Sequence, residues 1–306
     1  MKEELNVQGK PFVVKIELTE GCNFWCDFCA IRSIRKKPRD FKFMSVEVVR
    51  EIICKLKHYA SEVKGFDKIR FEIAMHGEPL FNPCCVEILK LIRDAFPFCS
   101  ILLMSNGGAI LEKKVDIYEI LKYVNVLALD DYGKYDIVKG ILEKVVDFPV
   151  YYYPEFNIYQ KHHWNLRCVV CVSDIQKGKV GVRSLHNTAG NSGPLSIVRV
   201  RQRCYRPFKE LVFNYLGDVL LCCNDWKGEF TLGNIFNNNI NELWNHSDLI
   251  SARKILFHKG RVFSICYGCN AFSPKNGLLP DGFAKFTMGL PNEKDFENVK
   301  KYSRRK

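Results

Sequence analysis

Apolar and polar positions alternate with two different periods along the first half of the chain. Ile69, Phe71 and Ile73 are spaced two residues apart, with charged residues between them, which predicts a β-strand with one face buried. Over residues 49–56, by contrast, apolar side chains recur at the spacing of a helix. Ser45 lies just before this segment and is a residue type that caps helix N-termini. The pattern therefore predicts a helix followed by a strand.

The same alternation of strand and helix continues on both sides of this pair. Further strands are predicted over residues 13–18, 101–104, 124–129 and 150–153. Further helices are predicted after Asn82–Pro83 and over residues 115–121 and 137–146. Strands that alternate with helices form parallel sheets with helical crossovers. Because fewer units are visible than the eight of a closed barrel, we predict an α/β fold, a partial (β/α) barrel of about six parallel strands.

The pattern changes after about residue 160. Residues 210–223, with the sequence ELVFNYLGDVLLCC, predict a β-hairpin that turns near Gly217. This hairpin is flanked by Cys204, Cys222, Cys266 and Cys269. We therefore predict a core over residues 1–160, a small cluster-binding domain of hairpin and helix over 161–290, and a basic C-terminal tail over 291–306.

Fourteen cysteines are many for a chain of 306 residues. No apolar run approaches the roughly 18 residues of a membrane helix, and the N-terminus lacks the apolar core of a signal peptide. We therefore expect a cytoplasmic protein without a membrane partner. Disulfides are disfavoured there, so clustered thiols indicate metal ligands. The cysteines in apolar contexts elsewhere, Cys54, Cys84, Cys85 and Cys99, are expected in the core.

The formal net charge is +12, and basic residues gather over 32–39 and 300–306. Two interpretations stay open: a solvated loop and tail, or a basic rim that attracts an anionic substrate or partner. Charge alone does not identify a nucleic acid.

Cys22, Cys26 and Cys29 form the pattern C-x3-C-x2-C directly after the first predicted strand. A structural zinc site has four protein ligands, and this stretch offers three thiolates and no histidine. A four-iron cluster held by three thiolates leaves one iron open to another ligand, much as catalytic zinc keeps an open position. The triplet thus predicts a catalytic iron–sulfur site, with zinc as the alternative.

This pattern resembles the signature of the radical S-adenosylmethionine (SAM) enzymes, and Phe28, directly before the last cysteine, fits it as well. The resemblance implies a [4Fe–4S] cluster whose open iron chelates the amino and carboxylate groups of SAM. It implies reductive cleavage of SAM to a 5′-deoxyadenosyl radical that abstracts hydrogen from a substrate. A flavodoxin- or ferredoxin-type reductant is the expected electron donor.

Two further segments match the same family in order and position. AMHGEPL, residues 74–80, resembles its GGEP segment, which meets the SAM amino group; Gly77, Glu78 and Pro79 match, whereas His76 replaces the first glycine. MSNGG, residues 104–108, resembles a second SAM-binding segment and implies that Ser105 and Asn106 lie near SAM.

The C-terminal cysteines supply the full ligand count of a closed cluster: Cys204, Cys222, Cys266 and Cys269. Together with the G-x4-C spacing from Gly217, they resemble the SPASM/twitch domains attached to many radical SAM enzymes. No cysteine follows Cys269, so the resemblance implies one auxiliary [4Fe–4S] cluster, and two clusters in the whole chain. A zinc knuckle is the alternative.

Three cysteines near these sites have no assigned ligand role. Cys168 and Cys171 are expected as buried strand thiols, with a cluster or substrate role as the alternative. Cys223 neighbours Cys222 on a strand, where adjacent side chains face opposite sides. It is either a packed thiol or a catalytic hydrogen-atom donor that quenches a substrate radical.

The leading functional hypothesis is a radical SAM enzyme that abstracts hydrogen from a polar small molecule of the carbohydrate or aminocyclitol type. Dehydrogenation would use the auxiliary cluster as acceptor of the second electron, and epimerisation would use Cys223. A peptide, a nucleotide or a nucleic-acid base is the alternative substrate. A non-catalytic iron–sulfur electron-transfer protein is the alternative from another class.

Overall fold

A computed structural model provides the structure of the chain. It describes residues 10–11, 13–63, 66, 69–132, 135–153, 155–156, 165–172, 179–180, 183–184, 189, 191, 203–267, 269–271 and 289–302.

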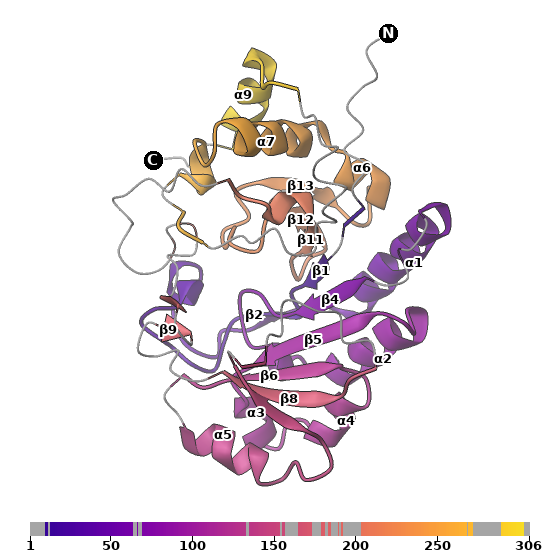
Figure 1. Cartoon of the computed structure of the whole chain (residues 1–306), viewed down its shortest axis with the longest axis vertical. Helices are drawn as coiled ribbons and strands as arrows, with labels where there is room; N and C mark the ends of the chain where they lie inside the picture. Colours follow the sequence, from indigo (N-terminus) through magenta and orange to yellow (C-terminus); the bar gives the residue numbers. More distant parts are fainter. Residues whose placement is uncertain are drawn as a thin grey trace.

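One large sheet organises both the core and the cluster-binding region (Figure 1). Its strand order is β13-β12-β11-β1-β4-β5-β6-β8-β7. The six strands of the core pair in parallel: β1 (Val13–Ile16), β4 (Arg70–Ile73), β5 (Ser100–Ser105), β6 (Val126–Asp130), β8 (Cys168–Val172) and β7 (Val150–Tyr152). The predicted parallel α/β architecture of about six strands is confirmed.

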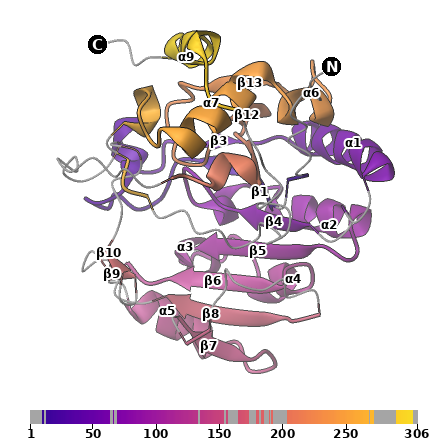
Figure 2. The same ribbon diagram turned by 45° about the horizontal axis from the view of Figure 1, so that its top comes forward.

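Helices of the core join these strands in the predicted order. They are α1 (Val46–Glu62), α2 (Cys85–Ala95), α3 (Gly108–Leu111), α4 (Ile117–Leu121) and α5 (Tyr135–Leu142). The Ser45 hydroxyl accepts a hydrogen bond from Val48 N at 3.3 Å, so Ser45 caps α1 as predicted. Figure 2 shows α1, α2 and α4 along one side of the sheet.

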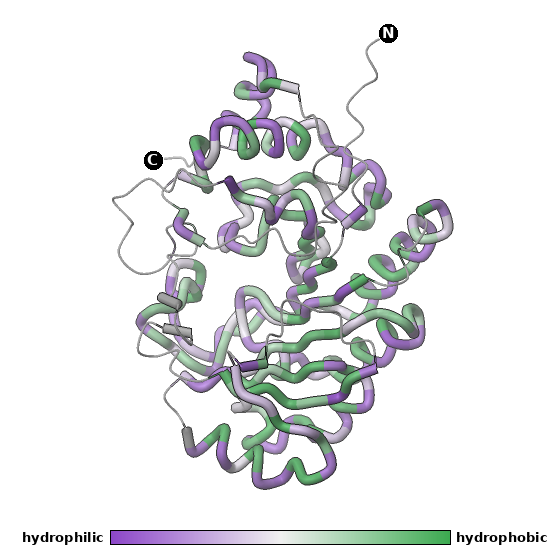
Figure 3. Tube along the Cα trace, viewed as in Figure 1, coloured by the Kyte–Doolittle hydropathy of each residue, from purple (hydrophilic) through white to green (hydrophobic). Residues whose placement is uncertain are grey.

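Alternate strand residues face two different environments. Val14, Ile16 and Phe71 lie in the main core with the apolar sides of α1 and α2. On the opposite face, β5, β6 and β8 contribute a smaller apolar cluster that includes Ala128 and Val170, and Figure 3 shows the apolar character of these strands. The charged residues of β1 and β4 lie on this second face, which the site described below uses.

The predicted hairpin of the second region is present and turns at Gly217, whose φ is +81°. Its strands are β11 (Glu210–Phe213) and β12 (Asp218–Leu220), followed by β13 (Thr231–Asn234). β11 pairs in parallel with β1, with Val13 opposite Glu210. The sheet therefore continues across the boundary predicted at residue 160, a pairing that no local pattern in the sequence reveals.

The structure describes five helices in the second region: η5 (Arg206–Phe208), α6 (Ile240–Trp244), α7 (Ser247–His258), η6 (Ser264–Cys266) and α9 (Glu293–Lys300). Of these, η5 contacts β11 and α9 packs on α7. Helix α9 lies within the region predicted as a basic tail and is fixed to α7 by a hydrogen bond from the Ser251 hydroxyl to Asp295 at 2.8 Å. Residues 303–306 lie outside the described residues.

Short elements complete the described chain: β2 (Thr19–Glu20), η1 (Ala30–Ser33), β3 (Lys42–Phe43), η2 (Pro79–Phe81), β9 (Lys179–Val180) and β10 (Arg183–Ser184). Within the described segments, no helix has the length and apolar character that a membrane crossing requires.

Candidate active site and cluster-binding cysteines

The cysteine triplet lies in the loop after β1, at the carboxyl ends of the parallel strands. The loop after β4 is fixed directly to it. Gly21 N donates to the carbonyl oxygen of His76 at 3.1 Å, and Glu78 N donates to that of Gly21 at 2.9 Å. Gly21 and Gly77 thus form a short parallel bridge between the two loops. The predicted GGEP-like segment is therefore adjacent to the triplet.

Gly77 is held where no side chain fits. A Cβ atom at this position would lie 2.2 Å from the carbonyl oxygen of Gly21 and 2.4 Å from that of Thr19. We expect Gly77→Ala to separate the two loops and to destabilise the protein by about 1–3 kcal/mol, the usual cost of overpacking. Urea unfolding measures this effect.

Gly140→Ala is the matched control, because the nearest atom to its added Cβ is 3.8 Å away in helix α5. Alanine in a helix is favoured over glycine by about 1 kcal/mol, so this variant should be at least as stable as the wild type. Equal unfolding midpoints for Gly77→Ala and the wild type would contradict the packing argument.

The three cysteine side chains are half-buried and are surrounded by groups that suit a metal-bound sulfur. Burial, together with the nearby Glu78 carboxylate, raises the pKa of Cys22 to about 12. Its Sγ accepts N–H groups from Phe24 N at 3.3 Å and Asn106 Nδ2 at 3.4 Å. Such a thiol loses its proton only when a cation binds it. The donor set therefore fits a cationic iron–sulfur core.

Separations between the sulfur atoms distinguish the two kinds of metal site. Bonds of about 2.3 Å in a tetrahedral zinc site place thiolate sulfurs about 3.8 Å apart. Among the described residues, no three cysteines have sulfurs that all lie within 4.8 Å of one another. The potential metal ligands that do lie this close are carboxylate oxygens of Glu17 and Glu20 and a ring nitrogen of His76. The three sulfurs of the triplet are therefore not arranged as a preformed tetrahedral zinc site.

Ser105, Asn106 and Glu78, which the family resemblance implies lie near SAM, form a single buried unit. The Ser105 hydroxyl donates to Glu78 Oε1 at 2.7 Å, and Asn106 N donates to Glu78 Oε2 at 2.7 Å. Pro79 begins η2, and Leu80 N donates to Glu78 Oε1 at 3.2 Å. Burial nevertheless raises the pKa of Glu78 to about 7. The structure thus brings these four residues together beside Cys22, and their contact with SAM stays a prediction.

Phe28 lies against two residues that sequence reasoning left without a role. Its ring stacks on Tyr132 with a centroid distance of 5.6 Å, and the Tyr132 hydroxyl donates to Asp130 Oδ2 at 3.1 Å. Burial raises the pKa of Asp130 to about 7, and the nearby Glu78 carboxylate adds to this shift. In the sequence, the position of Asp130 just beyond a predicted strand was the one indication that it could belong to the site. No feature of the sequence pointed to Tyr132.

All four members of the second cysteine set are buried: Cys204, Cys222, Cys266 and Cys269. Burial raises the pKa of Cys222 and of Cys266, and the other sulfurs of the set raise both further. Arg261 donates through Nη1 to the carbonyl oxygen of Cys269 at 2.5 Å and to its Sγ at 3.6 Å. The four thiols are therefore near enough to influence one another electrostatically, as ligands of one cluster would be.

Cys223 faces a different environment from Cys222. Its Sγ lies 3.3 Å from Arg206 Nη1 and 3.9 Å from Glu210 Oε2. The adjacent Lys15–Glu72 ion pair is buried on the same face of the sheet. Burial raises the pKa of Cys223, so the sulfur is held as a neutral thiol. Its catalytic role stays a prediction.

The remaining thiols divide into buried and exposed ones. Cys168 and Cys171 are buried in β8, in agreement with the packed-thiol interpretation. Cys85 and Cys99 are buried and Cys84 is half-buried. The expectation for Cys54 is wrong, because its position on α1 faces solvent.

Arginines among residues 32–39 form ion pairs with carboxylates of this chain. Arg35 binds Glu20, and Arg39 binds Glu112 at 2.5 Å. For residues 32–39, these ion pairs favour a partly solvated loop over a basic rim that attracts an anionic substrate.

Comparisons with known proteins agree with this arrangement. A model of the SPASM family, described as an iron–sulfur cluster-binding domain, matches residues 204–270. The S-adenosyl-L-methionine-dependent 2-deoxy-scyllo-inosamine dehydrogenase of Niallia circulans is 22% identical over 263 residues, covering 85% of this chain and 93% of that protein.

Two solved structures share the fold. A crystal structure of BtrN in complex with AdoMet and 2-DOIA has a TM-score of 0.66 at 19% identity and covers 88% of this chain and 96% of its own. A crystal structure of BtrN in an open conformation has a TM-score of 0.58 at 16% identity. This match covers 86% of this chain and 94% of the BtrN chain. Residues 204–270 thus match a SPASM-type iron–sulfur domain, and the chain shares the fold of these two structures; both findings agree with the resemblance of the cysteine triplet and the GGEP-like loop to radical SAM enzymes.

Proposed function

We propose that this enzyme dehydrogenates an alcohol carbon of a polar, aminocyclitol-like small molecule. The N. circulans relative is named as a dehydrogenase of 2-deoxy-scyllo-inosamine, and it aligns with most of this chain. The single observation that supports the proposal most is the pairing, in one continuous sheet, of a three-thiol site with a four-thiol site. The first can leave an iron open, whereas the second closes its cluster.

Two cofactors follow from this arrangement. A [4Fe–4S] cluster with SAM at the triplet supplies hydrogen-abstracting chemistry, and a second [4Fe–4S] cluster at the four buried cysteines supplies an electron acceptor. Cys22, Cys26 and Cys29 would hold the first, and Cys204, Cys222, Cys266 and Cys269 the second. A flavodoxin- or ferredoxin-type reductant and a cytoplasmic location, where free thiols persist, belong to the same proposal.

The chain's own residues prepare the SAM site electrostatically. Three hydrogen bonds, from Ser105, Asn106 and Leu80, orient the Glu78 carboxylate. An ionised carboxylate in this buried place attracts the ammonium group of an amino acid.

SAM affinity should depend on pH through Glu78. Because its pKa in the free protein is about 7, raised by burial, the carboxylate is protonated below pH 7 and must ionise to bind the ammonium group. We expect the SAM dissociation constant to increase about tenfold between pH 8 and pH 6, because the ionised fraction of Glu78 falls from about nine-tenths to about one-tenth. Anaerobic calorimetry on the cluster-loaded protein measures this.

Glu78→Gln is the control for this titration. It removes the ionisable group and should bind SAM weakly at every pH. A wild-type dissociation constant that is equal at pH 6 and pH 8 would contradict the assignment of Glu78.

Anaerobic turnover tests the proposed function. Reconstituted protein is incubated with SAM, dithionite and 2-deoxy-scyllo-inosamine, and we expect 5′-deoxyadenosine together with a ketone two electrons more oxidised than the substrate. Formation of 5′-deoxyadenosine without this ketone would retain the enzyme class and overturn the substrate. No 5′-deoxyadenosine with any polar substrate would support the rival interpretation, an electron-transfer protein.

Epimerisation is a second candidate, favoured by the half-buried thiol of Cys223, which lies beside Arg206 and whose pKa is raised by burial. A thiol can return a hydrogen atom to a substrate radical, whereas a thiolate cannot. Turnover in D2O distinguishes the two reactions: epimerisation incorporates solvent deuterium into a product of unchanged oxidation state, and Cys223→Ala abolishes it. Peptide and nucleic-acid substrates remain alternatives, and salt-sensitive binding of RNA or DNA would support the latter.

A further inference from the structure

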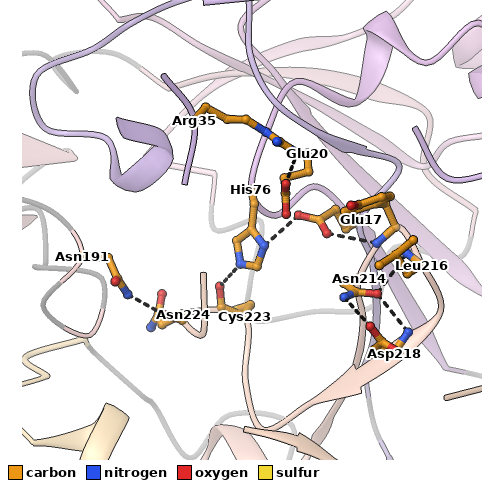
Figure 4. A network of polar contacts seen from close by, with 11 residues as sticks. Glu17, Glu20, Arg35, His76, Asn191, Asn214, Leu216, Asp218, Cys223 and Asn224 are labelled. Carbon is orange, nitrogen blue, oxygen red and sulfur yellow. Dashed lines mark hydrogen bonds and ion pairs between the residues drawn. The ribbon is translucent and has the colours of Figure 1, made fainter. Parts of the chain in front are cut away.

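His76 occupies the position at which the family resemblance expects a glycine, and its side chain is buried. Nδ1 of its ring lies 2.7 Å from Glu17 Oε1, and Nε2 lies 3.0 Å from the carbonyl oxygen of Cys223 (Figure 4). A glycine could make neither contact. The departure from the family pattern therefore creates a connection that the pattern itself lacks.

The two partners determine the state of the ring. A carbonyl oxygen only accepts hydrogen bonds, so Nε2 carries a proton. The Glu17 carboxylate is an acceptor as well, so Nδ1 carries the second proton. Burial alone would lower the pKa of His76, but Glu17 reverses this effect and raises it. The contact with Glu17 thus favours the protonated, positively charged form of the His76 ring.

Glu17 is itself fixed in place. It is fully buried, and Oε2 accepts a hydrogen bond from Tyr215 N at 3.0 Å, in the turn of the hairpin. The ion pair is therefore anchored to the end of β1 on one side and to β11–β12 on the other.

Through the main chain and the ring, His76 joins the two cluster-binding segments. Its carbonyl oxygen accepts from Gly21 N, the residue before Cys22. Its ring donates to the carbonyl of Cys223, the residue after Cys222. One residue thus contacts the immediate neighbour of a cysteine in each set.

Trp226 reinforces the same connection. Its ring lies 4.6 Å from that of His76, centroid to centroid. Trp226 also packs with Ala30 and Ile31 in a small apolar cluster that includes Cys22 and Cys29. The segment after Cys222 therefore packs, through Trp226, against the loop that contains Cys22 and Cys29.

A buried ion pair adds little net stability, since the cost of desolvation offsets most of the attraction between the charges. Apolar side chains would pack this junction at no such cost. The His76 ring instead provides directional contacts. Its two nitrogen atoms fix the position of the Cys223 carbonyl relative to the Glu17 carboxylate.

We propose that His76 is a positioning residue that sets the distance and orientation between the two cluster sites. It acts through the Cys223 carbonyl on the auxiliary site and through Gly21 on the SAM site. The proposal uses the presence of both clusters and is independent of the substrate named above.

The test compares cluster-loaded His76→Ala with His58→Ala, a control on the exposed face of α1. A cavity of about 390 Å³ borders His76 and Trp226, so water can occupy the place of the lost ring. Hydrogen exchange reports on the backbone amides of residues 222–228. Pulsed dipolar EPR on the doubly reduced protein reports the distance distribution between the clusters.

For His76→Ala we expect exchange in residues 222–228 to accelerate about tenfold or more, the factor expected when a hydrogen bond to a charged group is lost. The inter-cluster distance distribution should broaden. His58→Ala should match the wild type in every measurement. An unchanged distance distribution in loaded His76→Ala would overturn the proposal.

Glu17→Gln covers the case in which His76→Ala does not retain both clusters. This variant keeps the imidazole and removes the charge of its partner. We expect a smaller change in the same direction, and wild-type exchange and distances in Glu17→Gln would equally overturn the proposal.

Discussion

Replacing Cys26 by alanine is expected to reduce 5′-deoxyadenosine formation to the background without enzyme. The triplet supplies three thiolates in half-buried positions, and no fourth cysteine of the described residues lies in its loop. Two thiolates cannot hold a four-iron cluster, so the iron content should fall from about eight to about four atoms per chain. Anaerobic iron analysis and chromatographic detection of 5′-deoxyadenosine measure both effects.

Cys54→Ala is the matched control, because Cys54 is an exposed thiol on α1. It should retain full iron content and activity. Cleavage of SAM by Cys26→Ala at the wild-type rate would show that the triplet does not hold the catalytic cluster.

Replacing Cys222 by alanine is expected to separate SAM cleavage from product formation. Cys222 is a buried member of the closed set, and its loss should remove the auxiliary cluster and about four irons per chain. The first site keeps its three thiolates, so 5′-deoxyadenosine should still form. The oxidised product should fall to background, because the acceptor of the second electron is missing.

Cys99→Ala controls for the removal of a buried thiol, since Cys99 is fully buried and distant in sequence from both sets. It should leave both readouts intact. Loss of SAM cleavage along with product in Cys222→Ala, with Cys99→Ala unaffected, would contradict the division of roles between the two sites.

Local signals in the sequence predicted most of the core. The Ser45 cap, the two periodicities and the hairpin at Gly217 depend on neighbouring residues, and the structure contains each of them. Both cysteine sets also follow from spacing. These features could be predicted because the physics that produces them acts within a few residues.

Features that depend on tertiary pairing were not predictable in this way. The register of β11 against β1 joins Val13 to Glu210. The insertion of β8 between β6 and β7 is equally non-local. No periodicity specifies which strand neighbours which, so the continuity of the sheet between the two cluster sites emerged only from the structure.

The site shows the same division. Gly77, Glu78, Ser105 and Asn106 were found by motif and are brought together by hydrogen bonds. The partners of His76, by contrast, are Glu17 and the main chain of Cys223, which lie 59 residues before and 147 residues after it along the chain. In the sequence, His76 was visible only as a departure from a glycine.

The central claim is that the triplet leaves one iron open to SAM. EPR of the dithionite-reduced Cys222→Ala variant, which should contain the first cluster alone, tests this most directly. We predict a [4Fe–4S]+ signal whose g-values shift on addition of SAM, while Cys26→Ala in the same background gives no signal. A cluster signal that is identical with and without saturating SAM would contradict the account.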